Sequence, residues 1–199
     1  MSDDSRPVDP LDAMEAEASD PVDVELVQAL RASLDKHARE RAEETTDDDG
    51  EPLPRLILEG PRPETGDPLL LVGYALLGHL QEGWEYATLH ASAAADDLRM
   101  AATVKLAGEG PLTLRHLHYL PDVAAACAEL RRSMYQDDGR GAWFNITIML
   151  RQNGAINFIV LDEQPPFAYW GPGDAELLRR DQELYPRDPE HLPFWHPAR

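Results

Sequence analysis

Residues 144–160 read FNITIMLRQNGAINFIV, and this stretch decides the fold class. Apolar and polar side chains alternate in its first half, so one face of a strand would be buried and the other face wet. Asn153-Gly154 supplies the positive φ angles that a tight reversal needs, and apolar residues continue beyond it. The stretch therefore predicts a β-hairpin of two antiparallel strands.

Upstream segments extend this hairpin to a sheet. Residues 98–106 alternate between apolar positions and wet positions, the latter including Arg99, Thr103 and Lys105. Residues 84–92 are rich in Trp, Tyr and Thr, which favour strands. Two shorter strands are predicted from the residues at 56–58 and 112–118.

Helices are predicted between and after these strands. Asp67 precedes a proline at the first position of an apolar helix over 68–80, which is a typical cap. Residues 121–135 form a second helix, whose apolar face comprises Val123, Cys127, Leu130 and Met134. Asp174 caps a last helix. We therefore expect an α+β fold, a single domain with an antiparallel sheet packed by helices.

The acidic charge is concentrated at the N-terminus. The 199 residues include 37 Asp and Glu against 18 Lys and Arg, a net charge of −19. Residues 1–52 hold 17 of these acids and 5 bases and contain few large apolar side chains. Such a segment buries too little surface to offset its ordering entropy. We expect a partly disordered acidic tail over 1–52 and a folded domain over 53–199.

One part of this tail is predicted to be helical. Asp20-Pro21 repeats the cap-and-proline pattern and begins a helix over about 21–39. Its apolar stripe comprises Val24, Val27, Leu30, Leu34 and Ala38. Docking of this stripe on the body of the same chain is favoured over docking on a partner, because amphipathic helices usually pack within their own chain.

Charge and composition also limit the partners. A strongly negative field repels phosphates, which argues against nucleic acid, and it favours a basic protein partner. The apolar stretch over 68–80 is too short to span a bilayer, and the N-terminus lacks the pattern of a signal peptide. The one cysteine, Cys127, allows no intrachain disulfide. We expect a cytoplasmic protein that does not bind a membrane.

The sequence offers little catalytic chemistry. It lacks Gly-x-Ser-x-Gly, Cys-x-x-Cys and His-Glu-x-x-His. His116 and His118 would share one face of a strand, but a zinc site needs further ligands, and His90 or His79 would have to supply them. Cys127 lies on an apolar helix face, which is typical of an inert core thiol. We expect no metal, no cofactor and no enzymatic activity.

The four tryptophans fall into two groups. Trp84 and Trp143 begin predicted strands, so we expect them in the core. Trp170 and Trp195 lie in proline-flanked segments and are the candidates for exposure at an interface, where tryptophan is enriched. The proline-rich end over 185–197 should lie extended against the body.

Four segments carry a resemblance to a known family. They are LQEGWE at 80–85, LRRSMY at 130–135, GAWFNIT at 141–147 before the Asn153-Gly154 turn and Asp162-Glu163, and YPRDPEHLP at 185–193. Together they resemble the YezG family over about residues 67–199. The chain departs from the family at 164–167, where Gln-Pro-Pro-Phe replaces a Pro-Trp-like segment and Trp170 follows later.

This resemblance implies an immunity protein, an antitoxin that binds and neutralises a cognate secreted toxin, commonly a nuclease. Trp84, Glu85, Trp143 and Asp162 match the family pattern. We expect the sheet side to hold a basic toxin through Glu85, Asp162 and Glu163, with Trp170 as an aromatic anchor. The alternatives are a chaperone-like or structural binding factor for a secreted protein and an enzyme with an unrecognised site. The toxin and the stoichiometry are left open.

Overall fold

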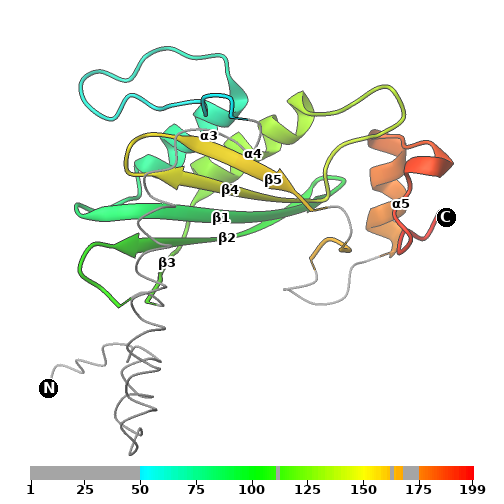
Figure 1. Ribbon diagram of the computed structural model, residues 1–199. Coiled ribbons are helices and arrows are strands. Elements are labelled where there is room, and N and C mark those ends of the chain that lie inside the picture. Colours follow the sequence, from blue (N-terminus) through cyan, green and yellow to red (C-terminus); the bar gives the residue numbers. More distant parts are fainter. Residues whose placement is uncertain (1–49, 111–112, 162–163, 168–174) are drawn as a thin grey trace, which may run out of the picture.

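Five antiparallel strands form one sheet in the order β3-β2-β1-β4-β5, in a computed structural model that describes residues 50–110, 113–161, 164–167 and 175–199 (Figure 1). The strands are β1 Trp84–Ala94, β2 Asp97–Leu106, β3 Arg115–Leu117, β4 Asn145–Arg151 and β5 Ile156–Val160. The helices are α3 Pro68–Leu77, α4 Pro121–Ser133, α5 Ala175–Leu184 and the 3-10 turn η1 Pro189–His191. The predicted α+β class with an antiparallel sheet is confirmed.

The predicted hairpin is the β4–β5 pair, in which Ile148 lies opposite Phe158. Gly154 has a φ of +83°, and a Cβ at this position would lie 2.5 Å from the carbonyl oxygen of Leu56. Both the left-handed backbone and this close approach therefore require glycine at the turn.

The strand predicted over 56–58 is wrong. An isolated antiparallel bridge joins Arg55 to Ala155, and the chain then leaves the sheet. The amide of Ile57 donates to the hydroxyl of Tyr74 on α3 at 2.9 Å, so this backbone group bonds a helix side chain instead of a neighbouring strand. The strand predicted over 112–118 is present but is limited to β3.

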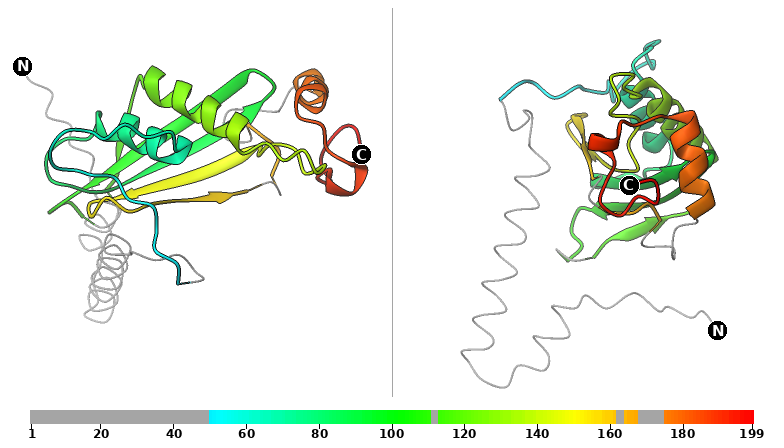
Figure 2. Two further views of the ribbon diagram at one scale, coloured as in Figure 1. Left: turned by 90° about the horizontal axis from the view of Figure 1, so that it is seen from above. Right: turned by 90° about the vertical axis from the view of Figure 1, so that its right-hand side faces the viewer.

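α3 and α4 lie together over one face of the sheet (Figure 2). Asp67 caps α3 as predicted, because its Oδ1 accepts from the amides of Leu69 at 2.9 Å and Leu70 at 3.3 Å. The helix ends at Leu77, three residues before the predicted end. The buried core between helices and sheet includes Val72, Leu76, Leu89, Val104, Val123, Cys127, Ile148 and Leu150.

A second, smaller cluster lies where α5 and the C-terminal segment meet one end of the sheet (Figure 1). Phe144 and Phe167 are its buried aromatic members. Trp195, a candidate for exposure, is half-buried and packs edge-on against Phe144 with ring centroids 4.9 Å apart. The C-terminal segment lies against the body as predicted, with Leu192 and His196 buried.

Several predictions fall outside the described residues. These are the acidic tail up to residue 49, its helix over 21–39 and the cap at Asp174. Within the described part, no helix has the length and apolar content needed to cross a bilayer.

Candidate functional site

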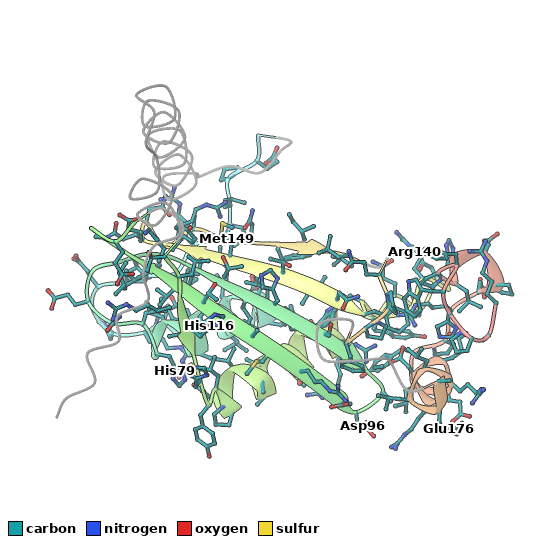
Figure 3. The ribbon with its side chains drawn as sticks, turned by 90° about the horizontal axis from the view of Figure 1, so that it is seen from below. His79, Asp96, His116, Arg140, Met149 and Glu176 are labelled. Atoms are coloured by element: carbon teal, nitrogen blue, oxygen red, sulfur yellow. The ribbon has the colours of Figure 1, made fainter. Side chains whose placement is uncertain are left out.

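The sheet face opposite α3 and α4 is uncovered by any described helix, and Figure 3 views the molecule from this side. Its side chains alternate along β1 with the buried Ala87, Leu89 and Ala91. We define the open face as nine positions that the strand registers place together: Thr88, His90, Ala101, Thr103, His116, Thr147, Met149, Asn157 and Ile159. All nine are half-buried or exposed.

The open face carries no formal charge at neutral pH, although the chain carries −19. The charged residues of the same strand faces lie toward the ends. Arg99 pairs with Asp97 at 3.0 Å and stacks on the Phe167 ring at 4.5 Å. Arg151 is buried and donates to Asn157 at 3.2 Å. The centre of the face therefore offers hydroxyl, amide, imidazole and apolar groups.

Lys105 was predicted to lie on a wet face, and this prediction is wrong. The side chain is buried, and its ammonium donates to the carbonyl oxygen of Glu109 at 2.8 Å and to that of Gly110. The alternation of β2 correctly predicts on which side of the sheet Lys105 lies. It does not reveal that the turn after β2 supplies carbonyl acceptors that bury the ammonium group.

Two histidines, His90 and His116, belong to the open face. His90 Nδ1 lies 2.9 Å from the hydroxyl of Thr147, and burial lowers the pKa of His90 below its ordinary value of 6.5. This histidine is therefore neutral at pH 7. The rings of His116 and His118 are 6.4 Å apart and nearly parallel. In the described part of the chain, no group of three or more His, Cys, Asp or Glu could hold a metal ion.

Of the predicted acidic contacts, the structure describes Glu85 alone. Glu85 lies in a bulge at the start of β1, whereas Leu161, which precedes Asp162, donates to Asn145 at the other end. The strand positions beside these points, Tyr86 and Ser92, are six residues apart, which is roughly 20 Å. Asp162, Glu163 and Trp170 themselves lie outside the described residues.

The two tryptophans of the family pattern are structural. Trp143 is 3% exposed, and Trp84 is half-buried against the main core, so their predicted core location is confirmed. The Trp143 indole N–H has no hydrogen-bond partner among the described residues. Trp143 is one of the residues that line a cavity, together with Met134, Ala142 and Val160.

Two further features were missed by sequence reasoning. The first is a buried ionic cluster of Arg131, Asp181 and Arg187, in which Arg131 is 50 residues from Asp181 in the sequence and no motif links the two. The second is the exposed border of the sheet at Phe158 and Ile159. The uncharged stretch over 155–161 was a signal for the second feature, because border strands usually carry charge or proline.

No protein-family model and no curated protein sequence matches this chain. The resemblance to the YezG family therefore rests on the four sequence segments quoted above. The function that this resemblance implies is a prediction, which experiments on the open face can test.

Proposed function

We propose that this chain is an immunity protein that binds and neutralises a cognate secreted toxin, which its open face covers. The observation that carries the proposal is the open face itself. It is a broad surface of nine uncharged side chains on a rigid sheet, with no described helix over it. The resemblance over residues 67–199 and the net charge of −19 add support.

The charge distribution suits a basic toxin. Glu85 lies near one end of the open face, and Asp162 and Glu163 come soon after β5 in the sequence. Cations around a nuclease cleft would meet these carboxylates at the border of the interface, while the centre supplies uncharged contact area. Opposite potentials speed the encounter and fix the register of the complex.

Neutralisation by this route needs no catalysis by the chain. The bound sheet occupies the toxin cleft, so nucleic acid cannot enter. A chaperone-like factor would instead bind the toxin and leave its activity intact. An enzyme would alter the toxin with repeated turnover, so substoichiometric amounts would suffice.

A titration distinguishes these three functions. The purified toxin domain, sought as the product of a neighbouring gene, is assayed for nuclease activity against increasing amounts of the full chain. We expect activity to fall linearly and vanish near equimolar protein. Binding without inhibition would favour the chaperone-like function, and inhibition at a small fraction of equimolar would favour an enzyme. Absence of binding would reject the proposal.

A further inference from the structure

β5 is the border strand of the sheet, and part of its outer side is unpaired. The segment before α3 covers only the start of β5, because the amide of Ile156 donates to Pro54 at 2.9 Å and Arg55 bridges Ala155. Beyond Ile156, no described strand lies on the outer side of β5. The sheet therefore ends in an edge that can accept another strand.

Hydrogen bonds within the hairpin show which groups this edge presents. The amide of Leu161 donates to Asn145, and that of Arg151 donates to Ala155, so odd-numbered residues of β5 bond inward to β4. Phe158 and Val160 consequently direct their N–H and C=O groups outward. These four groups have no backbone partner among the described residues.

The side chains of this edge are apolar and exposed. Phe158 is 39%, Ile159 59% and Leu161 47% exposed. Residues 155–161 contain no charge and no proline, the two devices that most often prevent a border strand from pairing. An apolar edge with free hydrogen-bonding groups is the geometry that strand addition uses.

A cavity of about 310 Å³ adjoins the same edge on the helix side of the sheet. Val160 forms part of its wall, and Met134, Ala142 and Trp143 supply further apolar wall. Arg140 and His191 line its polar part. A side chain that lies opposite Val160 on an added strand would therefore enter this cavity.

We propose that β5 pairs with β5 of a second copy of this chain, antiparallel about a twofold axis at Ile159. In this register Phe158 exchanges hydrogen bonds with Val160 of the second copy, and the two Ile159 side chains meet on the axis. Phe158 of each copy then lies beside Val160 of the other and fills its cavity. One surface serves both copies, which is the requirement of a twofold interface.

Symmetry and the lack of charge at the seam favour a second copy. β5 of each copy presents the same uncharged edge to the other, so no like charges meet at the seam, while the net charge of −19 on each chain adds a long-range repulsion that salt screens. The overlapping segment is short, because Pro54 and Arg55 limit it at one end. The contact is therefore small, and we expect the dimer to be concentration-dependent.

Sedimentation velocity of the full chain over a wide concentration range tests this dimer. We expect a monomer–dimer equilibrium that Ile159→Lys abolishes, because two ammonium groups would meet on the axis. The exposed position of Ile159 should leave the melting temperature unchanged. Leu184→Lys is the matched control, because Leu184 is an exposed leucine on α5, and it should leave the dimer intact.

A disulfide tests the register. Ile159 faces its copy in a non-hydrogen-bonded pair, whose Cα atoms are about 4.5 Å apart and within the range for a disulfide. Ile159→Cys should form a covalent dimer on mild oxidation, and Leu184→Cys should not. Cys127 cannot interfere, because it is fully buried.

Other results would overturn this proposal. A chain that stays monomeric at every concentration would overturn it. If the Phe158 and Val160 amides of that monomer were protected from hydrogen exchange, the same chain would cover the edge. A dimer that both Ile159 variants leave unaltered would place the contact elsewhere. Ile159 also belongs to the open face, so toxin binding is tested with Met149→Arg and not with the Ile159 variants.

Discussion

Arg131 on α4 and Asp181 on α5 form an ion pair of 2.7 Å whose side chains are 3% and 0% exposed. The other oxygen of Asp181 accepts from Arg187 at 3.1 Å, and the amide of Ala95 donates to Asp181 at 2.6 Å. Arg131 also donates to the carbonyl oxygen of Trp143 at 2.9 Å. The cluster thus joins α4, α5, the C-terminal segment and the end of β1 beneath the protein surface.

Removal of Asp181 should be strongly destabilising. Asp181→Ala leaves the buried guanidinium groups of Arg131 and Arg187 without their carboxylate, so we expect a loss of about 3–5 kcal/mol in the free energy of unfolding. The control is Asp96→Ala, because Asp96 pairs with Arg180 at the surface and should cost at most about 1 kcal/mol. Urea unfolding of both variants measures the difference. Equal losses would show that the buried cluster does not hold α5.

Cys127 should be inert in the folded protein. It is completely buried, and burial raises the pKa of its thiol to about 12, so the thiolate that reacts with disulfide reagents is scarce at neutral pH. We expect no reaction with a chromogenic disulfide reagent until denaturant is added, and then one equivalent. Rapid reaction of the native chain would mean that α4 opens under native conditions.

His196 should make stability depend on pH. Burial, and then repulsion from Arg187, lower the pKa of His196 below its ordinary 6.5, although Asp181 acts in the opposite direction. Below about pH 6.5 the unfolded chain therefore binds more protons than the folded chain, so the free energy of unfolding falls as pH decreases. His196→Gln should reduce this slope.

The matched control for that slope is His191→Gln, because His191 is exposed on η1. We expect the slope to change more in His196→Gln than in this control. Part of the slope should remain in the His196 variant as well, because burial also lowers the pKa of His90. Identical slopes for wild type and His196→Gln would contradict the assignment.

Local sequence signals predicted most of the helices and strands. They did not predict the contacts between residues that are far apart in the sequence. The Asn153-Gly154 turn and the cap at Asp67 act within a few residues, so the sequence shows them directly. The ion pair of Arg131 and Asp181 joins residues 50 positions apart, which no periodicity reveals. The candidate site was predicted as the sheet side with Glu85, Asp162, Glu163 and Trp170. The nine positions of the open face were not predicted, because which face the helices leave open depends on their docking.

If Asp162 contacts the toxin, its removal should raise the rate at which the complex dissociates. Asp162→Ala would leave a cation of the toxin unpaired in the interface, so we expect a faster dissociation rate and a loss of about 2–5 kcal/mol in binding. Glu183→Ala on α5 is the control and should change dissociation little. A fall in melting temperature together with binding would instead show that Asp162 holds the end of the hairpin.

The dissociation rate of a Met149→Arg variant from immobilised toxin tests the central proposal most directly. Met149 lies on the open face between Thr88 and Asn157 and is labelled in Figure 3, and an arginine there would place a cation against a basic partner. We predict dissociation at least about tenfold faster than wild type, equivalent to about 1.4 kcal/mol, with an unchanged melting temperature and no effect from Leu184→Arg. A dissociation rate equal to that of the wild type would show that the toxin does not bind the open face.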